Sequence, residues 1–248
     1  MESILTFEQV CAGYGRIQVL HELSFQVGRG EIFGIIGPNG SGKTTMLNVL
    51  TGLIRPTSGR ILLDGQEISS CSVDERCRRG LGRTFQIPRP FLRLSVYENV
   101  LAAAVFGAGM TERSGREKSL EILRTMGLYE KRAISSGALP LLDRKRLELA
   151  RAVATNPRVL LLDEVAAGLT SAEMEQIIEI TASLKRDGLT IVWIEHILET
   201  LVRSADRLMC IAQGRCAALG KPMEVLCTPV VEELYLGSEA EVEYLAGI

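Results

Sequence analysis

The stretch Gly37-Pro38-Asn39-Gly40-Ser41-Gly42-Lys43-Thr44-Thr45 decides how the rest of the chain is interpreted. It fits G-x-x-x-x-G-K-[ST], the pattern of a phosphate-binding loop. The mainly apolar residues 31–36 before it predict a strand that is buried on both faces. Residues 45–50 after it predict a helix that stops at Gly52. This order of strand, glycine-rich turn and helix predicts a site for a nucleoside triphosphate.

The residue types of this loop suit phosphate chemistry. Glycines let backbone N–H groups converge on an anion, and the following helix adds the positive end of its dipole. Lys43 is expected to reach the β- and γ-phosphates, and the Thr44 hydroxyl to ligate Mg²⁺. A glycine-rich turn with a chance lysine is the alternative, and both flanking elements argue against it. The predicted ATP-binding residues of the loop are Gly37, Pro38, Asn39, Gly40, Ser41, Gly42, Lys43, Thr44 and Thr45.

The composition is that of an ordinary globular protein. The chain has 248 residues, 46% of them hydrophobic, enough for one large α/β domain with a subdomain. A formal net charge of −2 argues against nucleic-acid binding through bulk basicity. No run approaches the length of a membrane span. The six cysteines form no C-x-x-C pair and the first residues do not resemble a signal peptide, so we expect reduced thiols in a cytosolic protein.

The chain order predicts an α/β core with additions. Residues 4–10 and 19–27 alternate as antiparallel strands around a turn at 13–15, which exposes Tyr14. That ring is suited to stack on adenine, although packing on its own hairpin is the simpler interpretation. From about residue 70 to 156 helical periodicity replaces strands, with an exposed loop expected at 107–115. The core then resumes with strand 159–162, helix 171–186, strand 190–194 and a hairpin of 207–212 with 215–219.

Two acids and a histidine follow the later strands of the core. Ligands of doubly wound sheets sit at the carboxyl ends of strands, where Asp163, Glu164 and His196 lie. Asp163 is suited to hold Mg²⁺, and Glu164 to polarise the attacking water. His196 would contact the γ-phosphate. A helix N-cap is the structural alternative for the acids, and a plain loop residue is the alternative for the histidine.

The order of these motifs resembles the ATP-binding subunit of an ATP-binding-cassette (ABC) transporter over nearly the whole chain. The resemblance implies an ABC ATPase fold for residues 1–236. This is a phosphate-loop NTPase core of the RecA type, with an N-terminal antiparallel β subdomain and a helical subdomain at about 70–156. It leaves residues 237–248 as an acidic tail. It further implies that Tyr14 stacks on adenine. Gln86 would belong to the nucleotide site, touch Mg²⁺ and face the membrane partner. Asp163 would be the metal-binding acid, with Glu164, His196 and Lys43 catalytic.

Within that family the chain is similar to the branched-chain amino acid importer subgroup. The similar stretches are Arg83-Thr84-Phe85-Gln86, residues 163–169 and the ending Leu234-Tyr235-Leu236-Gly237. The resemblance implies a peripheral ATPase on the cytoplasmic face of the inner or plasma membrane. Its implied partners are permease subunits, a second ATPase subunit and, indirectly, a solute-binding protein, with no role for nucleic acid. Arg89, Pro90 and Phe91 would belong to the permease contact, with a core position as the alternative for Phe91.

The family's signature Leu-Ser-Gly-Gly-Gln is replaced here by Leu139-Pro140-Leu141-Leu142-Asp143. Pro140 has no N–H, and the two leucines add bulk where glycines permit close approach to a γ-phosphate. Asp143 brings negative charge unless it is turned away. Thr170 also departs from the usual Asn or Asp. The chain thus offers a full phosphate half-site and a poor signature half-site, which favours a heterodimer. Alternatively, the variant loop contacts ATP through other backbone amides.

Other classes of protein remain in competition with a transport ATPase. One is a subunit that senses ATP with little hydrolysis, against which Glu164 argues. Another is a soluble ABC protein of repair or translation, which usually carries two cassettes or a coiled-coil insert. A small-molecule kinase would use the phosphate loop without needing the motifs that extend to His196.

Overall fold

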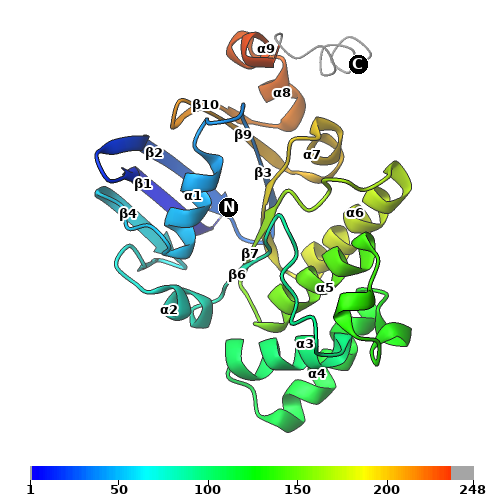
Figure 1. Cartoon of the computed structure of the whole chain (residues 1–248). Coiled ribbons are helices and arrows are strands. Elements are labelled where there is room, and N and C mark those ends of the chain that lie inside the picture. The colour runs from blue at the N-terminus through cyan, green and yellow to red at the C-terminus, as the bar shows by residue number, and fades with distance from the viewer. Residues whose placement is uncertain (1, 236–248) are drawn as a thin grey trace. The chain divides into compact units, whose positions relative to one another are not determined.

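The computed structural model describes residues 2–235. The chain divides into two compact units, Met1–Ser70 with Ile194–Ile248 and, separately, Cys71–Trp193. Figure 1 shows the elements of both units along the chain. Among residues 2–235, no helix is long and apolar enough to cross a membrane. The predicted acidic tail, and the end of the stretch that resembles amino acid importers, lie outside the described residues.

An antiparallel sheet forms one layer of the first unit. Its strands are β1 (Ser3–Tyr14), β2 (Ile17–Gly28), β4 (Ser58–Leu63) and β5 (Gln66–Glu67), in the order β2-β1-β4-β5. Phe7 of β1 stands opposite Phe25 of β2, and the two rings stack with centroids 4.6 Å apart. The predicted strands are confirmed, but they are longer than expected. Tyr14 therefore ends a strand and does not occupy the middle of a turn.

The first unit also contains the strand that leads into the glycine-rich loop. β3 (Ile32–Ile36) is parallel to β9 (Arg207–Ala212), which forms an antiparallel hairpin with β10 (Arg215–Gly220). Every residue of β3 is buried, as its apolar run predicts. The helix after the loop is α1 (Lys43–Thr51), and the left-handed Gly52 (φ 85°) ends it as expected. Up to residue 235, this unit also contains the helices α7 (Leu198–Ser204), α8 (Pro222–Leu226) and α9 (Pro229–Tyr235).

The second unit has its own strands and one long helix that was predicted in full. The strands are β6 (Leu81–Arg83), β7 (Val159–Asp163) and β8 (Thr190–Ile194), in the order β8-β7-β6, and the helix is α6 (Ser171–Arg186). β6 is parallel to β7 and lies where the sequence pattern predicted only helices. That expectation was wrong because three residues, one of them Gly82, are too few to show strand periodicity.

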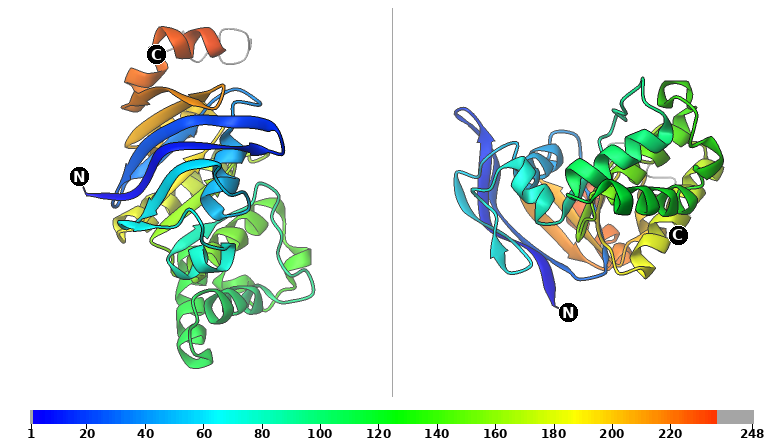
Figure 2. Two further views of the ribbon diagram at one scale, coloured as in Figure 1. Left: turned by 90° about the vertical axis from the view of Figure 1, so that its left-hand side faces the viewer. Right: turned by 90° about the horizontal axis from the view of Figure 1, so that it is seen from below.

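Helices make up the rest of the second unit. They are α2 (Val73–Arg78), α3 (Val96–Ala102), α4 (Glu112–Thr125) and α5 (Leu141–Ala154), with short helical turns η1 (Ala103–Gly107), η2 (Tyr129–Lys131) and η3 (Ser136–Ala138). α3, α4 and α5 pack on one another, and the views of Figure 2 show them running side by side.

The predicted loop at 107–115 is wrong at both ends. η1 extends to Gly107, and α4 begins at Glu112 after Thr111, whose hydroxyl accepts a hydrogen bond from the Ser114 N–H. Gly115 is buried inside α4. A Cβ atom there would lie 3.2 Å from side-chain atoms of Leu101 and Val105, so this glycine permits close packing and does not mark a loop.

Candidate functional site

The glycine-rich loop follows β3 in the first unit. Its backbone has a conformation that residue types other than glycine rarely adopt. Gly40 and Gly42 have φ angles of 78° and 110°, in the left-handed region. At Gly37, a Cβ atom would lie 2.2 Å from the Ile211 carbonyl oxygen and 2.7 Å from the Ser41 hydroxyl oxygen. The loop therefore needs its glycines both for backbone conformation and for close packing on β9.

The hairpin between β9 and β10 supports the end of this loop. The Gly214 N–H donates to the Ser41 carbonyl at 2.8 Å, and the His21 N–H of β2 donates to the Gly214 carbonyl at 2.9 Å. A Cβ atom at Gly214 would lie 1.7 Å from the Val19 carbonyl oxygen. The sequence indicated only a turn here, because a bond between two distant segments leaves no local pattern.

The inside of the loop fits a polyphosphate. Lys43 is 7% exposed, and its ammonium donates to the carbonyl oxygens of Gly37 at 2.5 Å and Pro38 at 3.0 Å. Among residues 2–235, the buried hydroxyl of Ser41 has no hydrogen-bond partner. The first turn of α1 contains no acidic residue. A buried cation, an unsatisfied donor and a helix N-terminus together form an electropositive cradle for phosphate oxygens.

Tyr14 and His196 belong to the same unit as this loop. The Tyr14 side chain is 51% exposed, and its hydroxyl accepts a hydrogen bond from the Asn48 amide of α1 at 3.3 Å. Its ring is thus linked to the helix that follows the loop. His196 is exposed. The N–H of the preceding residue, Glu195, donates to the Ile35 carbonyl at 3.4 Å, two residues before the loop begins.

The acidic part of the candidate site lies in the second unit. Asp163 ends β7, and its carboxylate pairs with the Arg83 guanidinium at 2.8 Å, the two side chains being 13% and 11% exposed. The Asp163 N–H donates to the Thr84 hydroxyl at 3.2 Å, which ties β7 to the end of β6. Carboxylate oxygens are ligands that Mg²⁺ uses in proteins, and the Arg83 guanidinium contacts one of the two Asp163 oxygens in this structure. In the first unit, the Thr44 side chain is exposed.

Gln86 and Glu164 meet in this unit. The Gln86 amide nitrogen donates to the Glu164 carboxylate. Glu164 has a left-handed backbone (φ 49°), and its carbonyl oxygen accepts a hydrogen bond from the Lys145 ammonium at 3.3 Å. Sequence reasoning did not identify Lys145. It also took Arg83 only as part of a subgroup pattern, because the partners of both residues lie on other elements.

The variant signature forms the start of α5. Pro140 is the N-cap residue, and the first intrahelical bond runs from the Arg144 N–H to the Pro140 carbonyl at 3.0 Å. Leu141 is 46% exposed, whereas Asp143 is only 3% exposed. The Asp143 carboxylate pairs with Lys131 and, at 3.6 Å, with Arg146. Its charge is therefore turned inward and compensated, although it does not cap the helix.

Thr170, the second departure from the family pattern, has a structural role. It is the N-cap residue of α6, and its hydroxyl accepts a hydrogen bond from the Glu173 N–H at 3.3 Å. The Glu173 carboxylate in turn accepts from the Thr170 N–H at 2.9 Å. This reciprocal pair is a capping box, which explains a threonine at this position.

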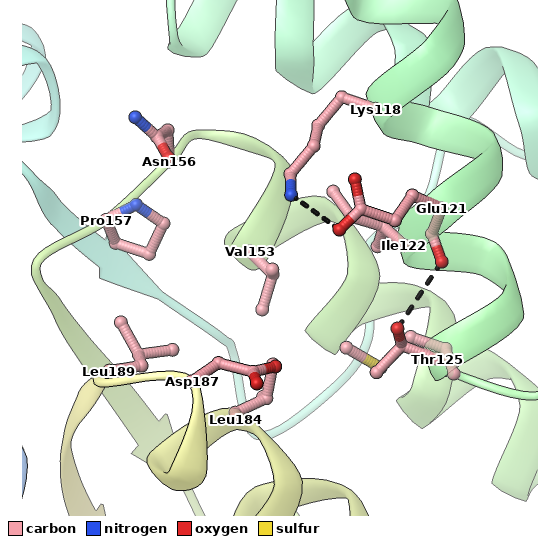
Figure 3. A pocket seen from close by; sticks show the side chains of 11 residues that line it. Lys118, Glu121, Ile122, Thr125, Val153, Asn156, Pro157, Leu184, Asp187 and Leu189 are labelled. Carbon is pink, nitrogen blue, oxygen red and sulfur yellow. Dashed lines mark hydrogen bonds and ion pairs between the residues drawn. The ribbon is translucent and has the colours of Figure 1, made fainter.

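A separate pocket of about 160 Å³ lies in the second unit among α4, α5 and α6 (Figure 3). Asn156 and Pro157 line it just before β7 begins, and Leu189 lines it just before β8. Lys118 and Glu121 of α4 form an ion pair at its edge, 2.9 Å long. Because ligands of such sheets bind at the carboxyl ends of the strands, this pocket at the amino ends does not belong to the candidate nucleotide site.

Comparison with solved structures defines the class of protein. The ADP conformation of MJ1267, an ATP-binding cassette of an ABC transporter, superimposes with a TM-score of 0.87 and 30% sequence identity, covering 96% of this chain and all of that one. A nucleotide-free cassette gives a TM-score of 0.86 at 29% identity, covering 94% and 99%. The fold, including its antiparallel sheet, is that of an ABC ATPase, as the sequence predicts.

Comparison of sequences defines the family. Residues 20–167 match the family model described as ABC transporter. The chain therefore belongs to the ABC transporter family and is an ATP-binding, ATP-hydrolysing subunit. ATPase subunits of this family dimerise and work with membrane permease components.

The similar proteins differ in what their names say they transport. The lipopolysaccharide export system ATP-binding protein LptB of Haemophilus influenzae is 34% identical over 237 residues, covering 96% of this chain and 98% of its own. The high-affinity branched-chain amino acid transport ATP-binding protein BraF of Pseudomonas aeruginosa is 34% identical over 249 residues, covering 94% and 98%. The chain is thus as similar to an export ATPase as it is to an amino acid importer ATPase. The importer subgroup that the sequence predicts is not the better match of the two.

Proposed function

We propose that the chain hydrolyses Mg²⁺-ATP to drive an ABC transporter that takes up branched-chain or related amino acids. The observation that carries the ATPase part is the electropositive loop around Lys43, together with the contact between Gln86 and Glu164. A module that only senses ATP has no need for a carboxylate held by a glutamine next to the metal-binding acid.

Each site residue has a proposed role. Lys43 and the loop amides bind the β- and γ-phosphates, and Tyr14 stacks on the adenine. Thr44 and Asp163 ligate Mg²⁺, which supplies charge neutralisation at the phosphates. The amide oxygen of Gln86 is a third ligand, while its nitrogen orients Glu164. Glu164 activates the water, and His196 positions it at the γ-phosphate.

The proposed partners are permease subunits and a second, different ATPase subunit. Exposed apolar side chains gather in the segment after β6, where Phe85, Ile87, Phe91 and Leu92 are 41–72% exposed, and this supports a permease contact there. Pro140 cannot donate an N–H at the signature position. A partner with an intact signature would complete the site at this chain's phosphate loop. We therefore also propose that the chain lies on the cytoplasmic face of the membrane.

The proposed cargo is supported by sequence stretches and by one group of relatives. The stretches are Arg83-Thr84-Phe85-Gln86 and residues 163–169, and BraF represents the relatives. The relatives named LptB favour a second candidate, export of a lipopolysaccharide.

The test of cargo uses cells that lack this chain. We expect them to lose uptake of radiolabelled leucine, isoleucine or valine, and the wild-type chain, but not Glu164→Gln, to restore it. Normal uptake combined with loss of surface lipopolysaccharide, restored in the same way, would replace the importer with the exporter. Normal uptake and normal lipopolysaccharide would overturn both cargo proposals.

A further inference from the structure

The backbone at Glu164 is held in a conformation that a glutamate rarely adopts. Its φ angle of 49° lies in the left-handed region, where the Cβ atom of a residue with a side chain approaches the backbone closely. Asp163, just before it, is the last residue of a regular strand. The chain therefore turns between the two acids. Within this turn the Ala167 N–H donates to the Glu164 carbonyl at 3.3 Å, and a contact from another element would hold the same carbonyl further.

Lys145 of α5 supplies such a contact. Its side chain is 4% exposed, and burying an ammonium is costly unless polar groups receive it. The ammonium donates to the Glu164 carbonyl oxygen at 3.3 Å. A cation on this carbonyl favours the orientation of the peptide group that the left-handed backbone requires.

The same face of α5 also holds the segment that contains Gln86. Glu148, one turn after Lys145, accepts a hydrogen bond from the Arg89 N–H at 3.3 Å and pairs with Arg151 at 2.8 Å. Arg151 donates to the Arg89 carbonyl at 2.8 Å. Burial raises the pKa of Glu148, and the opposing effect of the nearby Arg151 charge is smaller. One helix face thus contacts both loops whose side chains, Gln86 and Glu164, bond to each other.

We propose that Lys145 is a positioning residue, which fixes the backbone of Glu164 and thereby aims its carboxylate for ATP hydrolysis. The inference rests on the proposed role of Glu164 as the residue that activates water. Lys145 acts through a carbonyl contact and does not touch the nucleotide in this proposal. Its loss should therefore affect the chemical step more than ATP binding.

The experiment compares Lys145→Met, Lys145→Arg and Lys145→Gln with the wild type. Lys118→Met, which removes a lysine from a surface ion pair, is the matched control. We expect Lys145→Met to lower kcat by about 10- to 100-fold, because small misplacements of catalytic groups cost that much. The KM and the Kd for ATP should stay within about twofold, since the loop amides and Lys43 are unchanged. Lys145→Arg should restore most of kcat. Lys145→Gln keeps a hydrogen-bond donor on a shorter side chain, so its kcat should lie between those of Lys145→Met and Lys145→Arg.

A second readout does not depend on activity. Hydrogen exchange of the amides at 164–168 should be faster in Lys145→Met than in the wild type and should return toward normal in Lys145→Arg. If Lys145→Met does not fold, the same comparisons are made with Lys145→Gln. Unchanged kcat and exchange in the folded variants would overturn the proposal, as would a fall in kcat that Lys145→Arg fails to restore. Glu164→Gln is measured in parallel, because full activity in that variant would refute the proposed function itself.

Discussion

At the scale of single residues, the thiols differ in how far the fold protects them. Burial, and secondarily the neighbouring Cys216, raises the pKa of the Cys210 thiol to about 11, whereas Cys227 is exposed. The thiolate is the reactive form, so Cys210 stays protonated and inert at neutral pH.

We expect iodoacetamide at pH 7.5 to modify Cys227 in the native protein and Cys210 only after denaturation, as measured by mass spectrometry of peptides. Equal rates of modification of the two cysteines in the native state would contradict this packing of β9.

Some residues of the candidate site could be predicted from the sequence, and others could not. The loop residues 37–45 were predicted because strand, glycines, lysine and helix are neighbours along the chain. Gly214, Lys145 and the pairing of Arg83 with Asp163 were not, because each contact joins segments far apart in sequence. The roles of Tyr14 and His196 could be assigned only through resemblance, and those roles stay predictions.

At the scale of elements, the start of α5 decides whether two copies of this chain can work together. Pro140, Leu141 and Leu142 replace the Ser-Gly-Gly of the family signature, while Asp143 is buried against Lys131 and Arg146. We expect Pro140→Ser, Leu141→Gly and Leu142→Gly combined, with Asp143 kept, to raise steady-state ATP hydrolysis by the purified chain at least about tenfold. The restored loop would add a hydroxyl and accessible N–H groups for the opposite γ-phosphate, and one such donor is worth about 10²–10³ in rate.

The matched control is Leu53→Gly, which removes another exposed leucine. Equal turnover by the wild type and the restored variant would mean that the N–H groups at the start of α5 already serve the opposite site, and would remove the reason for a heterodimer.

The N-terminus of α6 offers a test of stability. Thr170→Ala removes the capping hydroxyl, and we expect the Tm to fall by about 2–4 °C at pH 7. Hydrogen bonds from the Thr170 backbone N–H and hydroxyl lower the pKa of Glu173 in the folded chain. Stability from an acid with a lowered pKa is present above its unfolded pKa and is lost as pH falls through the folded value. The difference in Tm between the wild type and Thr170→Ala should therefore become smaller below about pH 4. Thermal unfolding followed by circular dichroism measures this, and a difference that is constant down to pH 3 would contradict it.

Elements were predictable where the hydrophobic pattern was long and uninterrupted. β7, β8 and α6 were placed within a residue because buried strands and a sixteen-residue amphipathic helix leave strong periodic signals. β6 is too short for such a signal. The segment around Gly115 was misassigned because glycine usually marks a loop, whereas here it lets α4 approach Leu101 and Val105.

At the scale of the whole molecule, the two units carry different parts of the proposed chemistry. The phosphate loop, Tyr14 and His196 belong to the first unit, and Gln86, Asp163 and Glu164 to the second. The order of these motifs along the chain predicted the ABC ATPase fold, and the solved cassettes confirm it. Cargo could not be predicted in the same way, because none of these residues is expected to contact a transported solute.

The central claim is that this chain provides a complete phosphate half-site whose turnover depends on Glu164 and on a better signature in its partner. The most direct measurement is ATP hydrolysis by a mixture of two copies. A helper copy carries Lys43→Ala to disable its own loop, together with Pro140→Ser, Leu141→Gly and Leu142→Gly. We predict that the wild-type chain with this helper hydrolyses Mg²⁺-ATP faster than either copy alone. Glu164→Gln with the same helper should bind ATP equally well but turn over about 10²–10⁴ times more slowly. Equal turnover by the wild-type and Glu164→Gln mixtures would contradict the claim.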